Sequence, residues 1–256
     1  MGEKDQVLSQ FGKNAANYVT SKMHASGEDL DLLIKIVEKN RKDNLLDIAT
    51  GGGHVVKALA PLFKQVTALD LTPEMLEKAE KFITSNGIGN VSFVQGDAEQ
   101  LPFSDQSFGT VTCRIAPHHF PNINRFVMES NRVLERNGLF LLIDNVAAEK
   151  DEYDHFYNYI EKKRDPSHYR AYKKTEWISL IENTGFIIES FTTFKKKFEF
   201  KKWCEMMQLP EKEQNELMAY MIAAEKETTD FLSIEVVENQ VLSFQGQAML
   251  LVARKE

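Results

Sequence analysis

The stretch LLDIATGGGHVVKALA, from Leu45 to Ala60, constrains the fold more than any other part of the chain. It combines an apolar run, three consecutive glycines and then apolar residues at helical spacing. We therefore expect a buried strand, a tight loop at Gly51–Gly53 and a helix. Glycine has no Cβ, so such a loop lets a ligand approach the backbone. In open parallel sheets, ligands bind beyond the carboxyl ends of the strands, where this loop would lie.

Strands and helices alternate through the first 145 residues. We predict further strands over 66–71, 91–95, 108–113 and 139–144, with helices between them and before the first strand. Two late strands, over 187–198 and 240–254, would form an antiparallel pair at a sheet edge. The pattern predicts an α/β fold, a three-layer sandwich with a doubly wound, mostly parallel seven-stranded sheet and an antiparallel edge strand.

The second half of the chain follows a less regular pattern. Residues 150–174 are polar and aromatic without a clear strand, residues 176–184 favour a helix, and residues 203–227 favour a helix interrupted at Pro210. Lysines at 195–197 and 201–202 form a local basic cluster, which we interpret as a solvated edge without a function.

Composition limits the possible partners and the compartment. A net charge of -7 argues against general affinity for nucleic acid. Two distant cysteines, Cys113 and Cys204, favour a reducing compartment. The N-terminus lacks an apolar signal core, and the longest apolar run, Leu139 to Ile143, is too short to cross a bilayer. We expect a cytoplasmic protein without integral membrane contact.

The glycine loop matches neither common phosphate motif. A dinucleotide fingerprint needs a third glycine where Val56 stands, and a triphosphate loop needs Gly-Lys-Ser/Thr, whereas His54 follows Gly53. Asp47 precedes the loop, and a buried acid there suits a cationic ligand better than a pyrophosphate. Asp70, 17 residues after Gly53, ends the second strand, where a carboxylate can accept hydrogen bonds from ribose hydroxyls or simply cap the next helix.

Three segments together resemble the class I methyltransferases that use S-adenosylmethionine. They are LLDIATGGGH at 45–54, VTALDLTPEML at 66–76 and VQGDAEQLPFSDQSFGTVTCR at 94–114, and the resemblance continues through NRVLERNGLFLLID at 131–144. The chain most resembles the small-molecule branch of this family, which includes the ubiquinone and menaquinone biosynthesis C-methyltransferases. The implied organisation is one domain over 1–256, with N-terminal cap helices at 1–42, a cofactor-binding core at 43–147, and lid segments and the last strands at 148–256.

The resemblance implies how each segment contacts S-adenosylmethionine. The expected contacts are the backbone of Ala49, Thr50, Gly51 and Gly53 at the methionine part, Asp47 near its ammonium group, Asp70 at the ribose hydroxyls, Leu71 and Met75 on the adenine, Asp97 and Ala98 at the adenine amino group, and Arg114 at the methyl-transfer centre. Ala49 replaces the commoner first glycine of the motif.

The N-terminal stretch FGKNAANYVTSKMH resembles the entry helix that covers the cofactor in this branch. Tyr18 and His24 are candidates for contact with the cofactor or substrate. The alternative is an amphipathic surface helix with a buried tyrosine.

The stretch CRIAPHHFPN, at 113–122, bears on the acceptor chemistry. It lacks the Asn/Asp-Pro-Pro-aromatic motif of enzymes that methylate nucleobase amines, so we expect no nucleic-acid substrate. His118 and His119 are candidate general bases, since imidazole titrates near neutral pH, with Arg114 as a third catalytic candidate. Alternatively, one histidine orients the next helix and the other packs on Phe120. We expect no metal site.

The segment KRDPSHYRAYKKTEW, at 163–177, resembles a lid in the same branch. His168 and Arg170 are candidates for binding an anionic or phenolic substrate group, with a solvated loop as the alternative. We expect a methyltransferase for C- or O-methylation of a small aromatic, quinone-like or other apolar acceptor, and a possible homodimer. The alternatives are a cofactor-binding protein without catalysis and an NAD(P)-dependent oxidoreductase.

Overall fold

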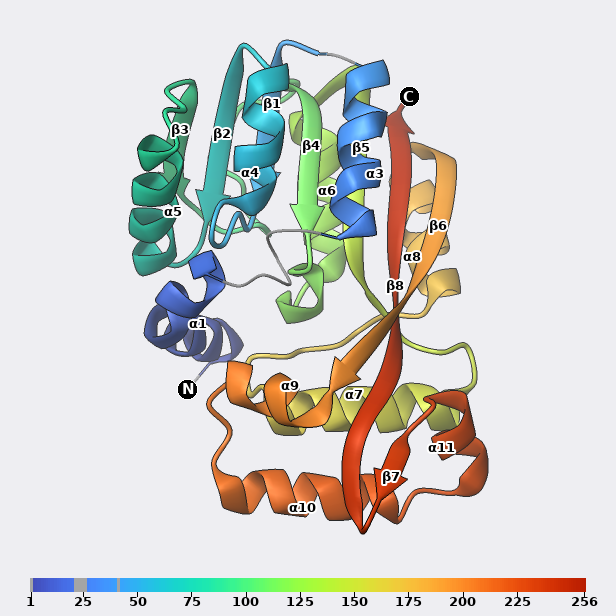
Figure 1. Ribbon diagram of the computed structural model, residues 1–256. Coiled ribbons are helices and arrows are strands. Elements are labelled where there is room, and N and C mark those ends of the chain that lie inside the picture. The colour runs from blue at the N-terminus through green and yellow to red at the C-terminus, as the bar shows by residue number, and fades with distance from the viewer. Residues whose placement is uncertain (1, 21–26, 41) are drawn as a thin grey trace.

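The computed structural model describes residues 2–20, 27–40 and 42–256, with only the backbone course described for 14–20. Its centre is one mixed sheet in the order β3-β2-β1-β4-β5-β8-β6, with the short β7 paired to β8 (Figure 1). The strands are β1 (Asn44–Ile48), β2 (Gln65–Asp70), β3 (Val91–Gln95), β4 (Phe108–Arg114), β5 (Leu134–Val146), β6 (Phe186–Glu199), β7 (Glu235–Val237) and β8 (Gln240–Lys255).

Helices cover both faces of this sheet. They are α1 (Glu3–Thr20), α3 (Glu28–Lys39), α4 (His54–Leu59), α5 (Pro73–Ser85), α6 (Ile123–Val133), α7 (Asp151–Arg164), α8 (Lys174–Asn183), α9 (Phe200–Met206), α10 (Glu211–Ile222) and α11 (Lys226–Phe231), with short 3₁₀ turns η1 (Ala60–Leu62) and η2 (Pro117–His119). Apolar side chains of α3 and α4 pack on one face, and those of α6 and α8 pack on the other. The predicted α/β sandwich is confirmed.

The first five strands are parallel, and β8 runs antiparallel to both of its neighbours, β5 and β6. Leu45, Leu46 and Ile48 of β1 are fully buried, as expected for a central parallel strand covered on both faces. The predicted late antiparallel pair is present. The antiparallel strand β8 lies one place in from the edge, and β6 forms the edge itself.

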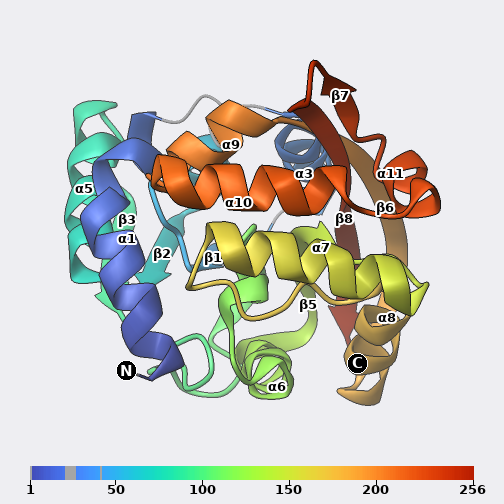
Figure 2. The ribbon, with the colours of Figure 1, turned by 90° about the horizontal axis from the view of Figure 1, so that it is seen from below.

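The strands β6 and β8 extend past the carboxyl ends of the parallel strands. There they lie beside α7, α9, α10 and α11, below the main sheet in Figure 1 and seen from beneath in Figure 2. Side chains of β6, β8, α7, α9 and α10, with Leu232 after α11, form a third buried cluster. Part of this cluster was not expected, because residues 151–164 form helix α7. Phe156, Tyr157 and Ile160 supply its buried face at helical spacing. Among the described residues, no helix is long and apolar enough to cross a membrane.

The loop after β1 places Ala49 in the left-handed region of backbone conformation, with φ 54°. Gly51 and Gly53 share this conformation, with φ values of 54° and 81°. A side chain makes this region unfavourable by about 1–2 kcal/mol for an ordinary residue, because Cβ approaches the carbonyl oxygen.

Replacing Ala49 with glycine therefore removes local strain. We expect Ala49→Gly to raise the free energy of unfolding by about 1 kcal/mol, measured by urea denaturation. The control is Ala58→Gly in helix α4, which should lower it by about 0.5–1 kcal/mol. A loss of stability in Ala49→Gly that matches the control would contradict the strain assigned to this residue.

Candidate active site

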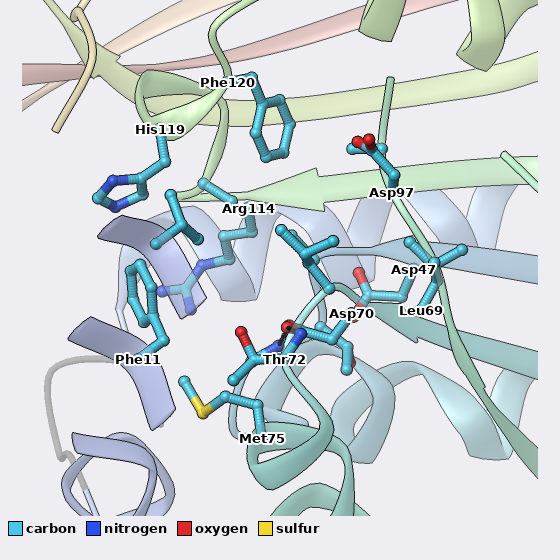
Figure 3. Close-up of a pocket in the computed structure, with 18 of the residues that line it drawn as sticks. Phe11, Asp47, Leu69, Asp70, Thr72, Met75, Asp97, Arg114, His119 and Phe120 are labelled. Atoms are coloured by element: carbon cyan, nitrogen blue, oxygen red, sulfur yellow. Dashed lines mark hydrogen bonds between the residues drawn. The ribbon is translucent and has the colours of Figure 1, made fainter. Parts of the chain in front are cut away.

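A pocket of about 1000 Å³ opens beyond the carboxyl ends of β1, β2 and β4 (Figure 3). Its walls come from the glycine loop, the loops after β2, β3 and β4, and the first turns of α1. The lining residues are Lys4, Val7, Phe11, Asp47, Ala49, Thr50, Gly51, Gly52, His54, Val55, Leu69, Asp70, Leu71, Thr72, Met75, Gly96, Asp97, Ala98, Glu99, Arg114, Ile115, Ala116, His119, Phe120 and Pro121. Its position, beyond the carboxyl ends of parallel strands, is that of a small-molecule site.

Asp70, at the end of β2, ties the glycine loop to the start of α5. Its carboxylate accepts the backbone N–H of Gly51 at 2.9 Å and that of Thr72 at 2.9 Å. Burial raises the pKa of Asp70, and these backbone donors partly oppose that shift. Two carboxylate oxygens carry about four lone-pair sites, so Asp70 retains the capacity to accept bonds from a ligand hydroxyl.

Asp47, inside the pocket, has an unused acceptor atom. The Thr112 hydroxyl donates to its Oδ1 at 2.7 Å, whereas Oδ2 is buried without a hydrogen-bond partner. Burial raises the pKa of Asp47 to about 6, and the Thr112 bond offsets part of that rise. The charge of Arg114 also lowers this pKa, but no ion pair to Asp47 is found among the described residues, so a cationic group beside Oδ2 would stabilise the buried carboxylate.

Asp97 lies at the opposite end of the pocket from Arg114 and His119 (Figure 3). Its Oδ1 accepts the backbone N–H of Glu99 at 2.9 Å, and its Oδ2 lies 2.6 Å from the ammonium of Lys4. Lys4 also pairs with Glu99 at 2.6 Å. Helix α1 is thus attached to this end of the pocket through a residue that the sequence analysis did not identify.

Helix α1 also covers the other end of the pocket. Its Phe11 ring meets the His119 ring edge-on, with centroids 4.9 Å apart, and its Gln10 amide contacts the sulfur of Met207 beyond α9. Of the two candidates in this region, Tyr18 lies in α1 but its side chain is outside the described part of the chain, and His24 is outside it altogether.

Arg114, at the end of β4, is held by Asp29 in the first turn of α3. Its Nε lies 2.9 Å from Asp29 Oδ2, and both side chains are at least nine-tenths buried. Burial acts to raise the pKa of Asp29, but the hydrogen bond and charge of Arg114 bring it below its usual value. The pair fixes the guanidinium at the pocket wall.

The two adjacent histidines have different surroundings. His119 lines the pocket, and its Nδ1 donates to the Ser167 carbonyl at 3.1 Å, so Nε2 is the nitrogen able to accept a proton. His118 is not among the lining residues, and its Nδ1 bonds Asp144 at 2.6 Å. Burial and the neighbouring His118 lower the pKa of His119 to about 3. Burial opposes charge on His118, but Asp144 raises its pKa.

The two candidates in the predicted lid, His168 and Arg170, do not line the pocket. His168 is buried and its Nε2 lies 2.9 Å from Asn158 Oδ1. Arg170 pairs with Asp154 at 3.0 Å and with Glu176 at 3.1 Å. Both residues therefore attach the segment between α7 and α8 to these two helices.

Comparison with known proteins assigns the chain to a family. Residues 46–142 match the family model described as a methyltransferase domain. Over 94% of its length and 96% of the relative's, the chain is 36% identical to the uncharacterized methyltransferase YcgJ of Bacillus subtilis (strain 168). The chain belongs to the class I S-adenosylmethionine-dependent methyltransferases.

This methyltransferase resembles two solved structures along nearly its whole length. BH2331 of Bacillus halodurans C-125 is 46% identical, with a TM-score of 0.88, covering 90% of this chain and 99% of that one. The YcgJ structure has a TM-score of 0.86 at 33% identity, covering 89% and 98%. UbiE of Rickettsia felis, a ubiquinone/menaquinone biosynthesis C-methyltransferase, is 28% identical over 63% of this chain and 66% of its own.

The pocket fits the cofactor that the family implies. The unpartnered Oδ2 of Asp47 suits an ammonium group, and the glycine loop presents backbone without side chains to a ligand. The methyltransferase thus acts on a small molecule, and the oxidoreductase alternative is excluded by the family. The residue contacts inferred from the resemblance stay predictions.

The raised pKa of Asp47 makes stability depend on pH. In the folded methyltransferase this carboxyl titrates at about 6, above its ordinary value of 3.8, so the folded chain holds a proton that the unfolded chain releases between these values. Asp47 therefore contributes most to the free energy of unfolding below about pH 4. This contribution falls by roughly 3 kcal/mol in total as the pH rises through 6.

We expect Asp47→Asn to remove this dependence. The stability of the variant relative to the wild type should increase between pH 4 and pH 8, measured by urea unfolding of the ligand-free proteins. Asp43→Asn, which changes an exposed carboxylate, is the control and should show no such trend. A difference between Asp47→Asn and wild type that stays constant with pH would contradict the raised pKa.

Proposed function

We propose that the enzyme methylates an oxygen or an activated carbon of a small, partly apolar acceptor, with His119 as the proton acceptor. The observation that carries this proposal is the end of the pocket next to Arg114. There Phe11, Ile115, His119 and Phe120 surround space beyond the three carboxylates. An apolar wall with one imidazole and one guanidinium suits an acceptor with an ionisable hydroxyl or a carbon acid.

We propose the cofactor contacts that the family resemblance implies, and the pocket brings these residues together around one space. Asp47 and the backbone of Ala49 to Gly53 would bind the amino-acid end, Asp70 the ribose hydroxyls, and Asp97 with Ala98 the adenine edge. Leu71 and Met75 would pack on the adenine ring. When bound, S-adenosylmethionine supplies an electrophilic methyl group. The protein then has to align the acceptor with that methyl and exclude water.

Each residue at the acceptor end has a distinct proposed role. His119 is neutral at physiological pH because its pKa lies near 3, so its Nε2 lone pair is available to take a proton from the acceptor. Arg114, held by Asp29, would stabilise negative charge on the acceptor. His118 would act through His119, whose basicity it lowers.

The effect of His118 can be measured directly. The His118 charge and burial together depress the pKa of His119, so we expect His118→Gln to raise that pKa toward its usual value of 6.5. The measurement is a pH titration of the His119 ring by NMR, with circular dichroism to check the fold. A His119 pKa that does not rise in the variant would contradict the coupling.

The catalytic role of His119 is tested with methyl-labelled S-adenosylmethionine and a cell metabolite extract. We expect His119→Ala to lower label transfer by about 100-fold or more, as for loss of a general base, while the affinity for S-adenosylhomocysteine stays unchanged. The exposed His155 of α7 provides the control, His155→Ala, which should keep wild-type transfer.

Two results would overturn this function. If His119→Ala transfers the labelled methyl group as well as the wild type does, His119 is not the proton acceptor. Binding of S-adenosylhomocysteine by the wild type, without label transfer to any component of the extract, would instead support a cofactor-binding protein without catalysis.

A further inference from the structure

Lys196, on β6, forms no ion pair among the described residues. It lies near enough to the Arg114–Asp29 pair at the pocket wall to interact with both charges, but it is not among the residues that line the pocket. Among the residues that the structure describes, no carboxylate lies within 4.0 Å of its ammonium and no hydrogen bond to it is found. Its neighbours in sequence differ. Lys195 is exposed, and Lys197 pairs with Glu235 at 3.0 Å. Lys196 is partly buried, and this burial lowers its pKa.

Strand register places Lys196 on the same face of the sheet as Arg114. Arg114 pairs with Ile143, and Asn145, two residues further along β5, pairs with Ala248 of β8. Gly246, two residues before Ala248, pairs with Lys196. Paired residues share a face, as do residues two apart along a strand. Arg114, Asn145 and Lys196 therefore point to the face of the sheet that α3 covers.

One unused polar atom and one buried hydroxyl lie in the same region. The Oδ1 of Asn145 is buried without a hydrogen-bond partner. The hydroxyl of Tyr157 is also buried, and its burial, together with the charge and hydrogen bonding of Glu161, raises its pKa. A Cβ built on Gly246 would lie 3.3 Å from that hydroxyl, so Tyr157 reaches the strand position directly opposite Lys196.

The charges around Lys196 leave it as the surplus cation. The carboxylates that influence it belong to Asp29, Asp144 and Glu161. Each already has another basic partner: Arg114 at 2.9 Å from Asp29, His118 at 2.6 Å from Asp144, and Arg164 at 2.9 Å from Glu161. A buried ammonium without a close counter-charge is unfavourable, so an anion bound here would be favourable.

We propose that the methyl acceptor carries a second, anionic group, a carboxylate or a phosphate, that binds Lys196. Asn145 Oδ1 accepts a hydrogen bond from a hydroxyl or amine of the acceptor. The reacting atom then lies toward Arg114 and His119. This inference rests on the proposed methyltransferase function and adds the charge class of the substrate.

The first test separates the metabolite extract on an anion-exchange resin at pH 7 before labelling. We expect the labelled product in the anionic pool and at least ten-fold less transfer by Lys196→Met, with unchanged affinity for S-adenosylhomocysteine. Lys196→Arg should restore part of the transfer. Lys195→Met, which removes the adjacent exposed lysine, is the matched control and should label like the wild type. Separately assayed carboxylate and phosphate sub-fractions identify the anionic group.

Label in the neutral or cationic pool, or full transfer by Lys196→Met, would overturn the proposal while leaving the methyltransferase function standing. Absence of label from every pool would contradict the methyltransferase function itself. A second measurement then tests whether an anion binds at Lys196. Lys196 is acylated with acetic anhydride in the presence of S-adenosylhomocysteine, and modification at residues 195–197 is read by mass spectrometry. The anionic pool should protect Lys196 and not Lys195, and equal protection by the neutral pool would overturn the site.

Discussion

The buried carboxylate of Asp70 joins the two loops on which the pocket depends. One oxygen holds the N–H of Gly51 after β1, and the other holds the N–H of Thr72 at the start of α5. The backbone N–H of Thr50 also bonds the Leu69 carbonyl at 2.9 Å, so the ends of β1 and β2 are connected twice. These bonds hold the backbone of the glycine loop at the pocket wall. The Asp70 carboxylate still has lone pairs that can accept a hydrogen bond from a ligand hydroxyl.

Around this junction, the charged groups fall into two kinds. Arg114 with Asp29, and His118 with Asp144, form buried pairs whose charges are matched within the protein. Asp47 and Lys196 lack such a close partner, and in our proposals Asp47 faces the ammonium group of the cofactor and Lys196 an anionic group of the acceptor. Unmatched buried charge lowers stability, and ligands of opposite charge would offset that loss. The same feature that weakens the free enzyme therefore selects what binds to it.

Local sequence patterns predicted the fold core and one half of the pocket. The glycine loop and Asp70 could be predicted from local pattern, because a strand end, a turn and a helix start lie within a few residues of each other, whereas Asp97 was implied by the family resemblance. The role of Lys4 could not be read, since it pairs with Asp97 across 93 positions and nothing local indicates that contact. The same holds for Asp29 with Arg114, and for Phe11 against His119.

Two features that the sequence analysis did not predict have a recognisable pattern in the sequence. The spacing of Phe156, Tyr157 and Ile160 indicates helix α7, although the polar residues between them obscured it. The lysines at 195–197 were interpreted as one solvated cluster, yet in a strand the middle residue must face the opposite side from its neighbours. Lys196 lies between Phe194 and Phe198, both packed in hydrophobic clusters, and that alternation indicates an inward-facing lysine.

The most direct test of the central claim is a crystal structure of the enzyme with S-adenosylhomocysteine. We predict the amino group beside Asp47 Oδ2, the ribose hydroxyls at Asp70, and the adenine next to Asp97, with the sulfur directed toward Arg114 and His119. Density for the nucleoside outside the pocket, or a ribose without contact to Asp70, would contradict the assignment of the three strand-end carboxylates to the cofactor.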